Sequence, residues 1–152
     1  MNLKRHVALQ PLSRDHLIGL FHAQRLIKLA ENCTDHLLTK TIEAFSEAWH
    51  SEIVVHFADE DRLFRPLPVA EKSLARLEKE HIELTKLIER VFEQPYSASL
   101  ATRVGSLLDA HIRWEEHDLF PEIETTLSES QLAELATQTQ RIEASRHRQL
   151  FN

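Results

Sequence analysis

Two five-residue segments of this chain each combine a histidine with a glutamate four residues later. They are His-Phe-Ala-Asp-Glu at 56–60 and His-Ile-Arg-Trp-Glu at 111–115, and each is followed by Leu-Phe and then a proline. Residues four apart lie one above the other on the same face of an α-helix, so each segment directs one imidazole and one carboxylate to the same point. Two such helices facing one another would bring together most of a dinuclear metal site.

Two further histidines fall on helix faces that the apolar pattern turns inward. His81 takes a position on an apolar stripe where a leucine would fit, and His16 lies four residues before Leu20. One histidine on such a stripe is more often a hydrogen-bonded core residue than a ligand. A buried, ionised glutamate is different, because it needs a cation or several hydrogen-bond donors. Two glutamates, each one turn from a histidine, favour metal binding, and the candidate ligands are His16, His56, Glu60, His81, His111 and Glu115.

Polar residues near these candidates are assigned other roles. Asp61 and Glu116 lie one position further along and point about 100° away, which predicts a solvated face. Glu52, four residues before His56, either accepts a hydrogen bond from an imidazole N–H or is solvated. His22, His50 and His117 lie off the ligand face and are expected at the surface or behind the candidate ligands. His6, His36 and His147 lie near helix or chain ends and are expected to be exposed.

Hydrophobic periodicity predicts the helices that would position these residues. Three of them span about 14–31, 35–64 and 69–93, and a fourth starts near 97–99 and meets Pro121, which either kinks or ends it. Ser13 and Thr34 are the expected N-caps of the first two helices. Ser128 and Gln131 have the spacing of a capping box for a fifth segment at 129–147, which is polar and expected to pack loosely outside the others.

Length and composition limit the fold and the class of protein. The 152 residues are expected to form one domain, 1–152, with a core at about 9–127 and a helical tail at 128–152. Only 2 glycines and 5 prolines favour an all-α fold, and the short connections favour an up-down-up-down antiparallel four-helix bundle with a short C-terminal helix.

Charge and targeting signals narrow the expected partners. The net charge of -6 without a basic stripe argues against nucleic acid and anionic membranes, and no apolar run reaches transmembrane length. The N-terminus lacks a signal-peptide stretch and Cys33 is the single cysteine, so a cytoplasmic location is expected. The sequence does not predict an oligomeric state.

Four imidazoles and two carboxylates suit iron, manganese or zinc, and iron best if two ions share bridging carboxylates. Suppose that Glu60 and Glu115 both bridge, that each ion takes two histidines, and that one oxo or hydroxo group also bridges. Each octahedral ion then keeps one open position, where dioxygen, peroxide, nitric oxide or azide would bind.

The ordered set of candidates resembles the hemerythrin-like cation-binding domain, also called the HHE domain, over roughly residues 9–135. The resemblance rests on His16, on the two His-x-x-x-Glu segments, on Glu80-His81, and on the Leu-Phe-Pro that follows the second segment. It implies a four-helix bundle with an oxo- or hydroxo-bridged diiron site, in which the four histidines are terminal ligands and the two glutamates are bridges. Family members include oxygen carriers, oxygen or iron sensors, and proteins linked to nitric oxide stress and iron–sulfur repair.

Two departures from the oxygen carriers leave the function open. The carriers have a second histidine one turn after that of the third helix, where this chain has Thr85, and they place the last carboxylate five residues after its histidine. Here Glu115 and Glu116 are both acidic, and a straight helix selects Glu115. Binding or sensing of dioxygen, nitric oxide or iron is expected first. The alternatives are a diiron oxidoreductase acting on peroxide or nitric oxide, an iron donor in iron–sulfur repair, and a structural bundle that binds zinc.

Overall fold

The computed structural model describes residues 4–151, and the side chains of residues 4–146. Every regular element in this part of the chain is helical, which confirms the all-α class. The α-helices are α1 (Gln10–Lys28), α2 (Asp35–Ala48), α3 (Val54–Phe64), α4 (Glu71–Glu93), α5 (Ala98–Trp114), α6 (Phe120–Thr126) and α7 (Glu129–Phe151). Two π-helical turns, η1 (Trp49–Ile53) and η2 (Glu115–Leu119), lie between α2 and α3 and between α5 and α6.

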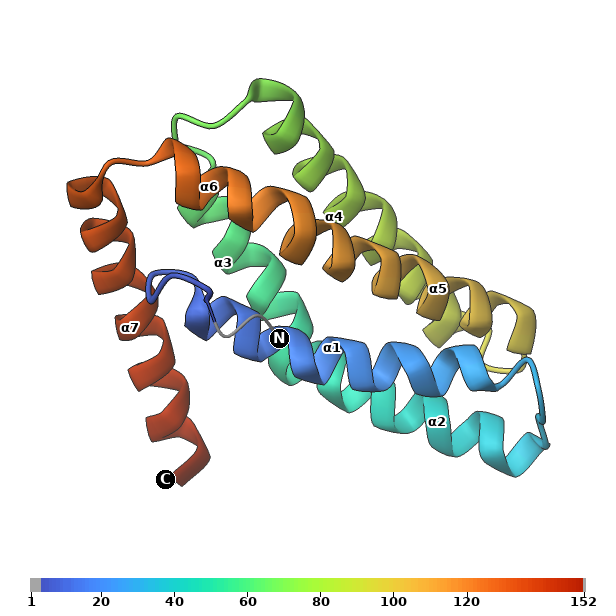
Figure 1. Cartoon of the computed structure of the whole chain (residues 1–152). Helices are drawn as coiled ribbons and strands as arrows, with labels where there is room; N and C mark the ends of the chain where they lie inside the picture. The colour runs from blue at the N-terminus through green and yellow to red at the C-terminus, as the bar shows by residue number, and fades with distance from the viewer. Residues whose placement is uncertain (1–3, 152) are drawn as a thin grey trace.

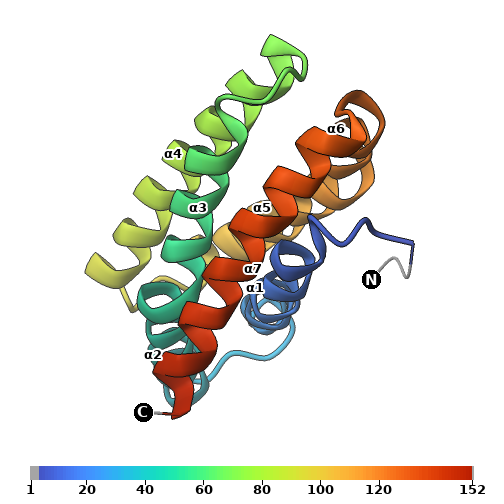
Figure 2. The ribbon, with the colours of Figure 1, turned by 90° about the vertical axis from the view of Figure 1, so that its left-hand side faces the viewer.

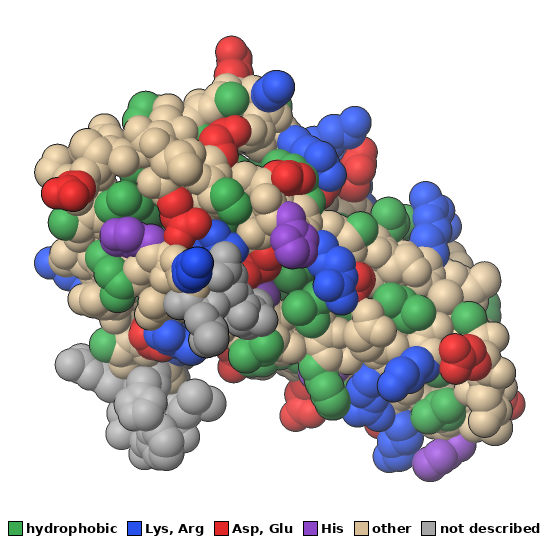
Figure 3. Space-filling view, viewed as in Figure 1, with side chains coloured by type: hydrophobic (Ala, Val, Ile, Leu, Met, Phe, Trp, Pro, Cys, Tyr) green, Lys and Arg blue, Asp and Glu red, His purple; other side chains and the backbone are tan. Residues whose placement is uncertain are grey.

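The π-helical turns join their neighbours into continuous rods, so that α1, α2–α3, α4 and α5–α6 form four rods that lie side by side (Figures 1 and 2). Successive rods run in opposite directions (Figure 1). No helix in residues 4–151 is long and apolar enough to cross a lipid bilayer. On the face drawn in Figure 3, lysines and arginines are scattered among acidic side chains.

The C-terminal helix differs from the expected short, loose tail. With 23 residues, α7 is as long as α4, and it lies beside the start of α1 (Figures 1 and 2). Although mostly polar, α7 buries three apolar side chains among those described, so it is packed rather than loosely attached: Leu132, Leu135 and Ala136.

The helix ends follow the capping signals in all but one case. The Thr34 hydroxyl accepts from Leu37 N at 3.0 Å, and Ser128 and Gln131 form a reciprocal capping box with bonds of 3.2 and 2.8 Å. The expected cap at Ser13 is wrong. Because Pro11 is well suited to a first helical turn, α1 begins at Gln10 and Ser13 lies inside the helix.

The core is divided into two apolar clusters with a polar layer between them. One cluster contains Phe45, Ile88 and Leu108, and the other contains Phe64 and Phe120. Each rod passes from one cluster to the other, and at the crossing it presents its candidate ligands. The two clusters therefore fix the position of the polar layer along the length of the rods.

The chain's two glycines, Gly19 and Gly105, lie where α1 and α5 pack closely against one another. A Cβ at Gly105 would lie 2.7 Å from Leu26 Cβ and 2.8 Å from the Ala23 carbonyl oxygen. A Cβ at Gly19 would meet only the Ile112 side chain, with Cδ1 at 2.7 Å. The atoms that Gly105 would meet belong to or adjoin the α1 backbone, which cannot shift without moving the helix. The end of the Ile112 side chain, in contrast, can rotate away from Gly19.

Gly105→Ala is therefore expected to lower the free energy of unfolding by about 1–3 kcal/mol, in spite of the better helix propensity of alanine. Gly19→Ala should be close to neutral, because a propensity gain of about 1 kcal/mol offsets a small shift of Ile112. Denaturant unfolding of both variants at equal metal content measures the difference. Equal destabilisation by the two substitutions would contradict the close backbone approach at Gly105.

Candidate metal centre

The six candidate ligands converge in the polar layer, and each is at most 5% exposed. They come from all four rods. His16 is on α1, His56 and Glu60 are on α3, His81 is on α4, His111 is near the end of α5, and Glu115 is the first residue of η2.

Glu60 faces three of the histidines. Its Oε2 lies 3.6 Å from His16 Nε2 and 3.1 Å from His56 Nε2. Its Oε1 lies 3.3 Å from His81 Nε2. The two oxygens of this carboxylate therefore point to different histidines.

Glu115 repeats this arrangement from the opposite rod. Its Oε2 lies 3.6 Å from His16 Nε2, while its Oε1 contacts His111 Nε2 and lies 3.9 Å from His81 Nε2. Each carboxylate thus presents one oxygen to a first pair, His16 and His56, and the other to a second pair, His81 and His111. The two resulting groups of four residues share both glutamates, and in each group the ligand atoms lie within 4.8 Å of one another.

The π-helical turn η2 starts at Glu115, and the Phe120 N–H bonds to the Glu115 carbonyl, five residues back. Such turns occur often at functional sites. The extra residue in the turn comes after Glu115, so the spacing from His111 to Glu115 keeps its α-helical register and Glu115 faces inward. The structure brings Glu115, rather than Glu116, into the layer.

Each of the four histidines in the layer also contacts, on the side of the ring away from the layer, a carboxylate of another rod. The Nδ1 atom faces this carboxylate, which leaves Nε2 directed into the layer. An acceptor behind the ring fixes the tautomer in which Nε2 carries the lone pair that a metal needs. The pairs are His16–Glu116 at 2.9 Å, His56–Asp15 at 3.0 Å, His81–Asp61 at 2.9 Å and His111–Glu80 at 2.8 Å.

These four pairs close a ring around the centre. The acid of α1 holds the histidine of α3, the acid of α3 holds that of α4, the acid of α4 holds that of α5, and the acid of η2 holds that of α1. Each rod therefore contributes one acid that contacts a histidine of a neighbouring rod, and one histidine that is contacted by the acid of another rod.

The expected solvated position of Asp61 and Glu116 is wrong, since both are partly buried and face a histidine. Asp15 and Glu80, for which the sequence pattern predicted no role at the site, do the same. A rotation of about 100° from a buried residue turns these side chains to the neighbouring rod and not to water. The sequence signal that marks these four acids is that each directly adjoins a candidate ligand: Asp15 precedes His16, Asp61 follows Glu60, Glu80 precedes His81 and Glu116 follows Glu115.

Other polar side chains stay outside the layer. Glu52 is partly exposed and makes no hydrogen bond or ion pair with the described residues, and His56 uses Asp15 instead. His36, His50 and His117 are exposed, and two more histidines, His6 and His22, are partly exposed. The side chain of His147 lies outside the described residues.

Eight buried atoms in the layer have no hydrogen-bond partner among the described residues: Nε2 of the four histidines and both carboxylate oxygens of the two glutamates. Buried polar atoms are nearly always hydrogen-bonded, so eight exceptions at one point need an explanation. Imidazole nitrogen and carboxylate oxygen are donors that transition metals prefer. The residues present therefore fit a metal centre.

The charges of the layer also indicate a place for cations. Burial alone would lower the pKa of His81, but Asp61, Glu115 and Glu60 outweigh it and raise this pKa to about 11. The pKa of His56 is raised to about 9, since Glu60 and Asp15 likewise outweigh the effect of burial. Burial opposes ionisation of Glu115, yet the surrounding histidines hold its pKa well below the usual range. Metal ions would replace protons that these carboxylates attract.

Comparison with known families matches residues 15–123 to the model described as the hemerythrin HHE cation binding domain. The matched stretch contains all six residues of the polar layer and their four acids, and it leaves out the N-terminal segment and α7. No curated protein and no solved structure matches the chain.

Proposed function

The chain belongs to the hemerythrin HHE cation-binding domain family, and we propose that it holds two iron ions and through them binds a small ligand such as dioxygen or nitric oxide. Glu60 and Glu115 would bridge the ions, with an oxo or hydroxo group as a further bridge. The first ion would take His16 and His56, and the second would take the other pair, His81 and His111.

The observation that carries this proposal is the division of the eight unpartnered atoms into two sets. One ion at either histidine pair would leave the two Nε2 atoms of the other pair buried and unsatisfied. Two ions use all eight atoms, because each carboxylate has one oxygen on each side. Iron suits such a nitrogen and carboxylate set with shared bridges, and manganese or zinc remain the alternatives for the loaded metal.

A small cavity beside the first pair supports a ligand of few atoms. It has a volume of about 10 Å³, and its lining includes the candidate ligands His16, His56 and Glu115. Such a volume corresponds to about one water molecule. The iron pair, when bound, would supply an open coordination position for the ligand. Two further acids, Asp15 and Glu52, line the cavity, and the remaining five lining residues are apolar and would favour a small uncharged molecule: Gly19, Ile53, Phe57, Leu108 and Ile112.

The position of the missing fifth histidine supports binding or sensing over simple oxygen carriage. Thr85 donates its hydroxyl to the His81 carbonyl at 2.7 Å, so this group serves its own helix. Each ion would then have two histidines, in contrast to the unequal pair of the oxygen carriers.

Metal analysis tests the proposal directly. Protein expressed with adequate iron should carry close to two iron atoms per chain, and its oxidised form should show near-ultraviolet charge-transfer bands that change with oxygen or nitric oxide. One ion or none in carefully loaded protein would contradict the dinuclear site. A colourless protein with tightly bound zinc would select a structural role, and steady consumption of peroxide or nitric oxide would select an oxidoreductase.

A further inference from the structure

The parts of the chain outside the family match place two arginines behind one of the two histidine pairs. Arg5 lies in the N-terminal segment and Arg146 lies on α7, whereas the match covers residues 15–123. Each arginine contacts an acid that holds a histidine of the first pair.

Arg146 reaches His56 through Asp15. Its Nη1 donates to Asp15 Oδ2, and the same oxygen lies 3.0 Å from His56 Nδ1. Its Nη2 donates to Asp59 Oδ2 at 2.5 Å. One guanidinium group therefore ties α7 to both α1 and α3, and it does so at the acid behind a candidate ligand.

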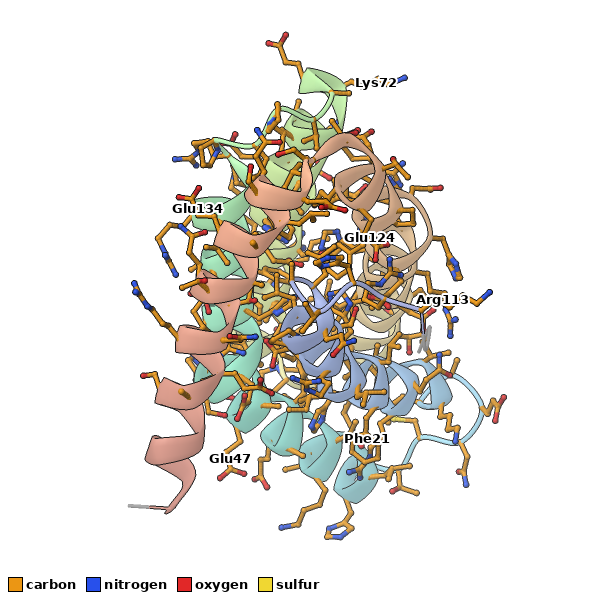
Figure 4. The ribbon with its side chains drawn as sticks, turned by 60° about the vertical axis from the view of Figure 1, so that its left-hand side comes forward. Phe21, Glu47, Lys72, Arg113, Glu124 and Glu134 are labelled. Carbon is orange, nitrogen blue, oxygen red and sulfur yellow. The ribbon has the colours of Figure 1, made fainter. Side chains whose placement is uncertain are left out.

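Arg5 reaches His16 through Glu116. Its Nη2 donates to the Glu116 backbone carbonyl at 2.7 Å and lies 3.7 Å from Glu116 Oε1, while Glu116 Oε2 lies 2.9 Å from His16 Nδ1. Its Nη1 donates at 2.6 Å to Glu124, which is labelled in Figure 4. The Arg5 side chain is only 4% exposed, so its positive charge is held away from water.

The two arginines belong to one packed assembly. Thr139 on α7 donates its hydroxyl to the Ala8 carbonyl at 2.8 Å. Apolar side chains of α7 share a cluster with those at the start of the chain: Ala8, Leu9, Leu12, Leu132, Leu135 and Ala136. We call residues 4–9 and α7 together the flanking unit.

Neither Arg5 nor Arg146 contacts an acid behind the second histidine pair. Glu80, behind His111, pairs with Arg76 of its own helix at 2.7 Å. Asp61, behind His81, forms an ion pair with neither Arg5 nor Arg146. Arg5 and Arg146 therefore contact the acids behind the first pair and not those behind the second.

We propose that Arg146 and Arg5 are positioning residues, through which the flanking unit sets the metal affinity of the first position, at His16 and His56, and not that of the second. This inference rests on the proposed function. An imidazole that binds metal through Nε2 must keep its Nδ1–H bonded, and the arginine fixes the acid that receives this bond. Loss of such an outer partner typically weakens metal binding by about 10- to 100-fold.

Chelator competition with ferrous iron, without oxygen and on the full chain, tests the proposal. Arg146→Met should lower the affinity for one of the two iron ions by about 10- to 100-fold and leave the affinity for the other ion unchanged. The matched control is Arg14→Met, because Arg14 pairs with Glu143 at 2.6 Å and also joins α1 to α7, but touches no acid behind a histidine. The iron affinities of the control variant should stay within about twofold of those of the unmutated chain. Arg146→Lys should recover part of the lost affinity, since a lysine keeps one ion pair.

Double variants distinguish a role of Arg146 in positioning Asp15 behind His56 from a role in merely attaching α7 to the other helices. Arg146→Met should add no loss to Asp15→Asn, which acts on the same histidine, but should add its full loss to Glu80→Gln, which acts at the second pair. The inference would be overturned if Arg146→Met and Arg14→Met lowered iron affinity equally, or if Arg146→Met lowered the affinity for both ions equally. A wild-type chain that binds fewer than two ions would overturn the proposed function and this inference with it, and the unmutated protein alone reveals that outcome.

Discussion

Glu115→Ala is expected to remove more than about nine-tenths of the bound iron, and Glu60→Ala should do the same. Each of these carboxylates faces both histidine pairs, so its loss takes one ligand from each ion at once. Loss of a metal ligand generally costs more affinity than loss of an outer partner, for which about 10- to 100-fold is typical. Iron per chain after gel filtration measures the result.

Glu116→Ala and Asp61→Ala are the matched controls, since each removes an acid one residue away from a proposed bridge. Both hold a histidine from behind, so they should weaken binding but retain at least about half of the iron at saturating metal. An empty site in Glu116→Ala together with a filled one in Glu115→Ala would show that the inward register assigned to the start of η2 is wrong.

Removal of the metal should lower the melting temperature by about 5–10 °C. Ions that bind only the folded state stabilise it by about 2.7 kcal/mol at a 100-fold excess over Kd. In a chain of this length each kcal/mol corresponds to about 2–4 °C. The two apolar clusters on either side of the layer do not depend on metal, so the chain should stay helical. Circular dichroism before and after dialysis against a chelator tests this.

Readdition of iron is the control for that experiment, and it should restore the original melting temperature. An unchanged melting temperature after verified metal removal would contradict an interior site. A loss of most helical signal on chelation would instead show that the apolar clusters do not hold the rods together alone.

The sequence was sufficient to predict the helices and the six residues of the layer, because both depend on local geometry. The spacing of His56 and Glu60 puts both side chains on one face whatever surrounds them. The cap at Thr34 and the capping box at Ser128 and Gln131 are local in the same way.

The remaining features depend on contacts between distant segments. Whether the side chain of Asp61 meets water or another rod is decided by the neighbouring helix, which the spacing within one helix does not reveal. The packing of α7 depends on the few apolar residues that meet the start of the chain, in a helix that is otherwise polar. The π-helical turns have no marker in the sequence pattern, although η2 directly precedes Phe120 and Pro121.

The ring of acids and histidines has a consequence for transplanting this centre into another protein. Since each acid sits on a different rod from the histidine it holds, no single helix carries a complete unit of the site. A graft of the two His-x-x-x-Glu helices into a foreign bundle would bring both glutamates and two histidines, yet the imidazoles of His56 and His111 would lack the acids of α1 and α4. The smallest portable piece of this centre is therefore the full set of four rods.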